Sequence, residues 1–194
     1  LMLFLVAGGL PFFWGGLGVE EARAAATGAM MAYDTFSVTS TPKYRLWDGS
    51  SWGGELSAND VNGEIRHMVL KYAPTRNEAI LVTLGSTGEV QAQVWNGTSS
   101  SWGAVTTLGT VSDVNGSRDN QSSYRGFDLE YETTSGDAIA VFGDGTADPD
   151  YRVWNGSSWS SPTDINVPTT GIPAWIELAA SFGSDGLAMI LVDA

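Results

Sequence analysis

The sequence predicts an all-β fold of three repeated four-stranded antiparallel meanders after a short apolar N-terminal helix. Two recurring patterns carry this prediction. Tryptophan hairpins recur as RLWDGSSW, QVWNGTSSSW and RVWNGSSW, at 45–52, 93–102 and 152–159. Apolar runs recur in step with them as AMMAYD, AILVTL, AIAVFG and AMILVD, at 29–34, 79–84, 138–143 and 188–193. Self-similarity at a spacing of about 50 residues is typical of repeat architectures.

Each repeat contains the pattern of four short strands in a fixed order. The residues before each hairpin alternate polar and apolar side chains, as in a half-buried strand. Asp-Gly or Asn-Gly follows, and these residues tolerate the positive φ of tight hairpin turns. The second Trp opens the next strand, and a third follows at HMVLKYA, FDLEYET or IELAASF. The fourth strand is the apolar run, whose continuity predicts burial on both faces.

These strands define two regions of the chain. Residues 1–28 form an apolar assembly or anchor segment, and residues 29–194 form a β-repeat head. We expect the units of the head to span about 44–84, 91–143 and 151–193, with 29–34 as a spare strand. The spare strand either closes the sheet in its own chain or pairs with the edge of a neighbour. Because a unit ends at residue 193, we expect a true C-terminus or a domain boundary there.

The first nineteen residues, LMLFLVAGGLPFFWGGLGV, carry no charge. Their number approaches the roughly 20 apolar residues that cross a bilayer, but five glycines and Pro11 disfavour an isolated helix in water. Glycines also let neighbouring segments approach closely. We therefore expect assembly through the apolar side chains of Leu3, Phe4, Leu5, Leu10, Phe12, Phe13, Trp14 and Leu17. The membrane is then a partner only through this segment, before assembly.

Composition argues against several classes of function. Nine Lys and Arg against 22 Asp and Glu give a net charge of −13, which repels nucleic acid and anionic lipid. The chain has no cysteine, so it forms neither disulfides nor thiolate metal sites. We expect no cofactor and no metal. The nearest metal candidate is a calcium site in GDGTADPD, at Asp144, Asp148 and Asp150, whose spacing differs from an EF-hand loop.

The sequence also predicts that the chain is not an enzyme. No carboxylate stands in the apolar setting that marks a proton donor, and Asp128, Glu130 and Glu132 alternate with apolar residues as one solvated face of a strand. The hairpin tryptophans are repeat-packing residues or, alternatively, glycan-binding faces: Trp47, Trp52, Trp95, Trp102, Trp154 and Trp159. Sequons allow glycosylation at Asn96, Asn115, Asn120 and Asn155.

The hairpin motifs quoted above resemble those of Asp-box repeats, without the serine that precedes the Asp in the usual box. The unit length and strand pattern are similar to β-propeller blades, as in sialidases, kelch proteins and fungal fucose-binding lectins. The resemblance covers residues 29–194 and implies blade-like meanders. Closed propellers use four to eight blades, so three units predict a sandwich or an open barrel as the alternative to propeller-like closure.

The layout of an apolar N-terminus joined to a β-rich head resembles type IV pilin-like and archaeal pilin-like subunits. The Phe-Thr-Leu-Ile-Glu motif of those subunits and their glutamate near residue 5 are missing here. The leading hypothesis is a non-enzymatic extracellular structural protein, a homopolymer of copies of itself in a cell-surface filament. One alternative is a lectin-like β-propeller module that binds surface glycans in adhesion. The other is a membrane-anchored ectodomain that does not polymerise.

Overall fold

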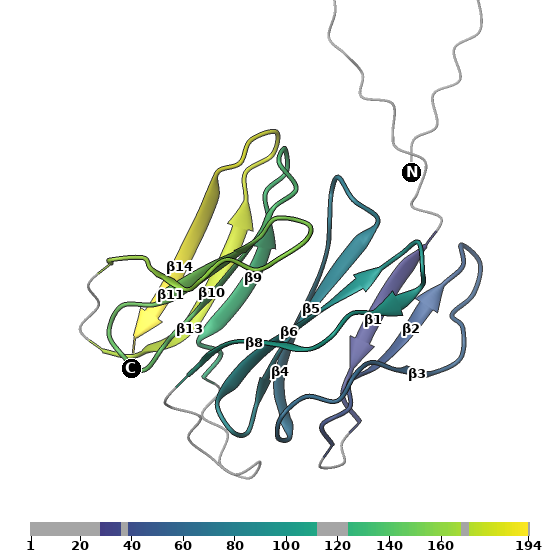
Figure 1. Cartoon of the computed structure of the whole chain (residues 1–194), viewed down its shortest axis with the longest axis horizontal. Helices are drawn as coiled ribbons and strands as arrows, with labels where there is room; N and C mark the ends of the chain where they lie inside the picture. Colours follow the sequence, from purple (N-terminus) through teal and green to yellow (C-terminus); the bar gives the residue numbers. More distant parts are fainter. Residues whose placement is uncertain (1–27, 36–38, 112–123, 168–170, 194) are drawn as a thin grey trace, which may run out of the picture.

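The computed structural model describes residues 28–35, 39–111, 124–167 and 171–193, and every regular element within them is a β-strand. Fourteen strands form four antiparallel sheets that succeed one another along the chain (Figure 1). The all-β prediction is confirmed for these residues, and the predicted N-terminal helix lies outside them. Across the same ranges, no helix has the length and apolar character to span a membrane.

The sheets contain three, five, four and two strands in chain order. The first sheet contains β1 (Ala29–Tyr33), β2 (Lys43–Trp47) and β3 (Leu56–Ser57). The second contains β4 (Ile65–Tyr72), β5 (Glu78–Gly85), β6 (Glu89–Asn96), β7 (Ser101–Trp102) and β8 (Thr106–Thr110). The third contains β9 (Phe127–Tyr131), β10 (Ala138–Phe142), β11 (Asp150–Trp154) and β12 (Thr163–Asp164). The fourth contains β13 (Pro173–Ala180) and β14 (Leu187–Asp193).

The sheets divide the chain at different places from the predicted units. Each Trp strand pairs with the apolar run before it, so β2, β6 and β11 lie beside β1, β5 and β10. The predicted unit 44–84 is therefore split between the first and second sheets. For β5 and β10 the physical reason is that a continuous apolar run favours a central position in the sheet, where the following Trp strand is its second neighbour.

Of the two roles expected for the strand at 29–34, pairing within its own chain is the one observed. β1 pairs in its own chain with β2, from Ala29 opposite Trp47 to Tyr33 opposite Lys43. It occupies the position that β5 and β10 occupy in their sheets, but it lies at the edge of the three-stranded sheet. The first sheet thus contains the last three strands of a repeat, and the fourth sheet contains the first two.

Apolar side chains fill the spaces between successive sheets. The largest cluster lies between the second and third sheets, where Ile80 and Val82 of β5 meet Phe127 and Phe142. A second cluster joins the first and second sheets around Trp95. A third cluster joins the third and fourth sheets. The four sheets therefore form a fan, with the first at the right and the fourth at the left of Figure 1.

Candidate functional site

Each Trp hairpin holds its two indole rings together across the base of the turn. Antiparallel pairing places the two tryptophans of a hairpin directly opposite each other. The ring centroids are 5.6 Å apart for Trp47 and Trp52, and 5.4 Å apart for Trp95 and Trp102. The rings of the third hairpin, Trp154 and Trp159, are 5.6 Å apart. The recurring pair is thus a cross-strand contact within one sheet.

The Asp or Asn after the first Trp organises the turn between the rings. Oδ1 of Asp48 accepts the backbone N–H groups of Ser50 and Ser51, each at 2.8 Å. Asn96 and Asn155 make the same two kinds of bond in their own turns. The backbone donors, that of Ser51 first, lower the pKa of Asp48 to about 2. Asp and Asn both suit the position after the first Trp, because each offers a side-chain oxygen that accepts these bonds.

The three hairpins differ in how much tryptophan surface they leave in solvent. Trp95 is 4% exposed and packs edge-on against Tyr44, with 5.5 Å between ring centroids. Trp52 is 40% exposed. The other four hairpin tryptophans are half-buried. Trp52 is therefore the hairpin ring with the most surface available to a ligand or a partner.

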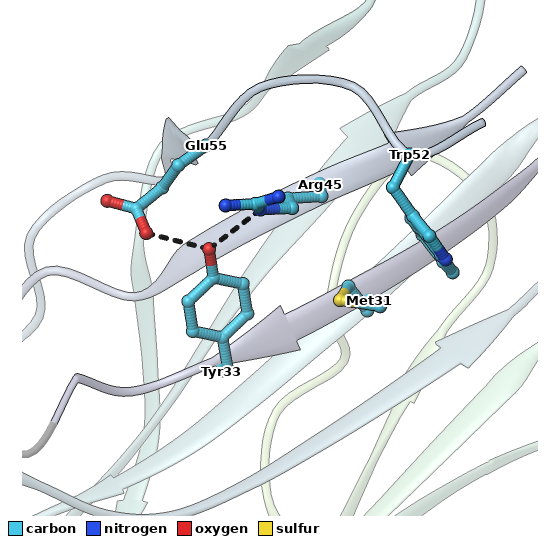
Figure 2. A pocket seen from close by; sticks show the side chains of 5 residues that line it. All are labelled: Met31, Tyr33, Arg45, Trp52 and Glu55. Atoms are coloured by element: carbon cyan, nitrogen blue, oxygen red, sulfur yellow. Dashed lines mark hydrogen bonds between the residues drawn. The ribbon is translucent and has the colours of Figure 1, made fainter.

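Trp52 lines a shallow hollow on the outer face of the first sheet, together with Met31, Tyr33, Arg45 and Glu55 (Figure 2). Its volume is about 460 Å³. The Tyr33 hydroxyl donates to Glu55 Oε2 at 2.7 Å and accepts from Arg45 Nε at 3.2 Å. The hollow thus combines an indole face with a row of hydrogen-bonding groups, a combination that suits a polar ligand with an apolar face.

The Trp hairpin motif singles out Trp52 in the hollow, but it does not indicate Met31, Tyr33 or Glu55. The strand period contained a usable signal, because Met31 and Tyr33 are two apart on β1 and share one face of the sheet. Arg45 lies directly opposite Met31 on β2 and extends the same face. No local pattern indicates Glu55, because it lies in the irregular segment between the hairpin and β3, and only the folded chain brings it to the hollow.

The acidic loop does not assemble as the calcium candidate would require. Oδ1 of Asp144 accepts the backbone N–H and the hydroxyl of Thr146, as in an ordinary turn. Burial first, and then the charge of Asp144, raise the pKa of Asp150. Nowhere in the ranges that the structure covers do three or more acidic or histidine side chains gather as potential metal ligands.

Other predicted residues lie in turns or outside the described ranges. Asn96 and Asn155 are exposed in their hairpin turns, where a glycan would have space. Asn115 and Asn120 lie outside the described residues. So do the eight apolar side chains assigned to assembly, Leu3, Phe4, Leu5, Leu10, Phe12, Phe13, Trp14 and Leu17.

Two buried carboxylates join neighbouring sheets. Glu78 Oε1 accepts hydrogen bonds from Arg76 Nε, the Tyr131 hydroxyl and Trp154 Nε1, at 3.0, 3.2 and 3.1 Å. Asp128 is 2% exposed, so its assignment to a solvated face is wrong. The approach of β13 to β9 covers it, and it accepts the backbone N–H of Leu178 at 2.7 Å.

No protein-family model matches the chain, and a search of curated proteins finds no similar sequence. Function is therefore inferred from the residues and their geometry.

Proposed function

We propose that the protein is a non-enzymatic extracellular subunit that assembles with copies of itself into a cell-surface filament. The observation that carries this proposal is the uncharged nineteen-residue segment directly before the acidic β-sheet head. Burying one Leu or Phe side chain contributes about 1.5 to 3 kcal/mol, so a segment with many such residues requires a cover. Copies of the same segment supply that cover, and its five glycines allow close backbone contact.

The head suits a surface-exposed role in this proposal. Its second and third sheets contain five and four antiparallel strands, and the four sheets form an open fan. A net charge of −13 keeps such a surface solvated and discourages nonspecific association between heads. Exposed sequon asparagines in the turns, Asn96 and Asn155, fit a glycoprotein.

Deleting residues 1–28 should abolish filament assembly and leave a soluble head. The head contains the three apolar clusters between its sheets, so we expect it to keep its strands. Negative-stain imaging and light scattering measure assembly, and far-ultraviolet circular dichroism measures the fold. Filaments from the truncated head would contradict the proposal. An intact chain that stays monomeric in detergent and in membranes would instead favour the anchored ectodomain.

A carbohydrate-binding module is the second candidate, and the hollow beside Trp52 is the observation that favours it. Indole faces stack on the apolar faces of sugar rings, and the Tyr33, Arg45 and Glu55 row offers hydrogen bonds to hydroxyl groups. If this function holds, the intact chain binds a defined set of glycans on an array.

In that case Trp52→Ala should weaken glycan binding about tenfold, by loss of a stacking contact worth about 1.4 kcal/mol. The matched control is Phe182→Ala, which removes an aromatic ring that is 86% exposed in the turn between β13 and β14. Equal binding by wild type and Trp52→Ala, or no binding by the wild type, would exclude glycan recognition in the hollow.

A further inference from the structure

Every contact between successive sheets uses the same two kinds of face. We call the face that a sheet turns toward the next sheet its leading face, and the opposite one its trailing face. In β5, Ile80 and Val82 belong to the leading face and pack on the third sheet. Ala79 and Leu81 belong to the trailing face and pack on the first sheet. Each internal contact thus joins a leading face to a trailing face.

The leading face of the fourth sheet has the side chains of such a contact but is exposed. The β4–β5 and β13–β14 hairpins can be aligned by the pairs that close them. Tyr72 pairs with Ala79, and Ala180 pairs with Leu187 across the same number of residues. Leu187 therefore corresponds to Ala79, and Ile190 corresponds to Val82. Val82 is fully buried, whereas Ile190 is 63% exposed. The next residue of this face, Val192, is 53% exposed.

The trailing face of the first sheet is exposed in the same way. Met31 lies opposite Arg45 as Leu81 lies opposite Gln93, so these positions are equivalent. Leu81 is fully buried, whereas Met31 is 37% exposed in the hollow that Trp52 lines. Figure 1 places β1 and β14 toward opposite ends of the fan. The two open faces are therefore one leading face and one trailing face.

We propose that the leading face of the fourth sheet in one copy packs on the trailing face of the first sheet in a second copy. The occupant is a second copy because its face has the correct pattern, with Ile190 and Val192 aligned toward Met31 and Trp52. The proposed contact repeats the leading-to-trailing relation that the chain already uses three times internally.

Charge also favours a second copy as the partner. Lys43 and Arg45 lie on the trailing face of the first sheet, where Lys43 Nζ donates to the hydroxyl of Ser57 and Arg45 Nε donates to that of Tyr33. With Glu55 in the same hollow, these two cations leave this face with a positive balance. Glu177 lies opposite Ile190 in the β13–β14 pair and is exposed on the leading face of the fourth sheet. In a chain of net charge −13, a cationic patch attracts the acidic surface of another copy.

This contact goes beyond the proposed function because it belongs to the head and uses no residue of 1–28. It joins different surfaces of the two copies, so it is head-to-tail and either closes a ring or extends a filament. It also covers the hollow, so a docked copy excludes a glycan from Trp52.

Thiol cross-linking of the intact chain tests the contact, because the protein has no cysteine of its own. One batch carries Met31→Cys and a differently tagged batch carries Ile190→Cys. The two are mixed and treated with a short bis-maleimide. We expect the mixed dimer to exceed the dimers of either batch alone by at least tenfold. In the control, Phe182→Cys replaces Ile190→Cys, because Phe182 is more exposed but lies in the turn. Equal yields with Ile190→Cys and Phe182→Cys would overturn the proposal.

Exchanging the charges of Arg45 and Glu177 provides a second test, in which mixing the two variants should restore the contact. Arg45→Glu and Glu177→Arg each place like charges on the two faces, so each should lower the cross-linking yield several-fold. In an equal mixture of the two, every contact between unlike chains pairs opposite charges again. The yield between unlike chains should return to the wild-type level, and failure to return would also overturn the proposal.

The two proposals fail in distinguishable ways. If the intact chain forms filaments that vanish on deletion of 1–28, but Met31→Cys and Ile190→Cys do not cross-link, the head contact is wrong and the filament function stands. If they cross-link, but deletion of 1–28 leaves assembly unchanged, the head contact stands and assembly through the N-terminus is wrong.

Discussion

Replacing Trp95 with alanine should lower the free energy of unfolding by about 3 to 5 kcal/mol. Trp95 is 4% exposed and forms the centre of the cluster between the first and second sheets. Its ring meets Tyr44 and Trp102 edge-on, with centroids 5.5 and 5.4 Å away. Removing the indole therefore leaves a cavity and breaks two aromatic contacts, each worth about 0.5 to 1.5 kcal/mol beyond area burial.

Urea unfolding followed by far-ultraviolet circular dichroism measures this loss. The matched control is Trp52→Ala in the first hairpin, which changes the same residue type in a ring that is 40% exposed. We expect Trp52→Ala to cost less than Trp95→Ala, because the exposed part of the Trp52 ring gains nothing from burial. Equal losses for the two variants would show that the Trp95 contacts are not a main source of stability.

The sequence predicted the strands better than it predicted their partners. The Trp hairpins and apolar runs indicated an all-β fold because strand period and turn residues are local signals. The sheets begin at other residues than the predicted units, because the same alternating order of strands is consistent with several starting points. Only pairing decides among them, and pairing places β1 beside β2 and β5 beside β6.

The candidate site was partly predictable for the same reason. Trp52 was found from its motif, whereas its exposure depends on the first sheet having nothing packed on its trailing face within the described ranges. Asp128 was misassigned because alternation identifies a face of a strand but not what later covers that face. Here β13, about 50 residues further along the chain, covers it. Such long-range contacts leave no local pattern in the sequence.

Replacing Glu78 with alanine should destabilise the fold by about 2 to 4 kcal/mol, because two buried donors, Tyr131 and Trp154, lose their acceptor. Arg76 is 28% exposed and keeps Asp137 at 3.8 Å, so it adds little to this loss. One oxygen of this carboxylate accepts bonds from Arg76, Tyr131 and Trp154. Burial first, and then the Glu78 charge, raise the pKa of Tyr131 far above its usual value. The hydroxyl therefore stays protonated and donates. Without Glu78, the Tyr131 hydroxyl loses this buried acceptor, at a cost of its own.

The conservative variant Glu78→Gln separates the negative charge of Glu78 from its volume and its acceptor oxygen. Its amide oxygen still accepts from Tyr131 and Trp154 but carries no charge for Arg76, so we expect a loss of about 1 to 2 kcal/mol. A double-mutant cycle of Glu78→Ala with Tyr131→Phe should show a coupling of about 1 kcal/mol. Urea unfolding measures each corner. Zero coupling would show that the Tyr131 bond to Glu78 contributes nothing to stability. Equal losses for alanine and glutamine would show that the charge of Glu78 alone carries its effect. A nonzero coupling, with a smaller loss for glutamine than for alanine, would show that Glu78 joins the second sheet to the third through its hydrogen bonds.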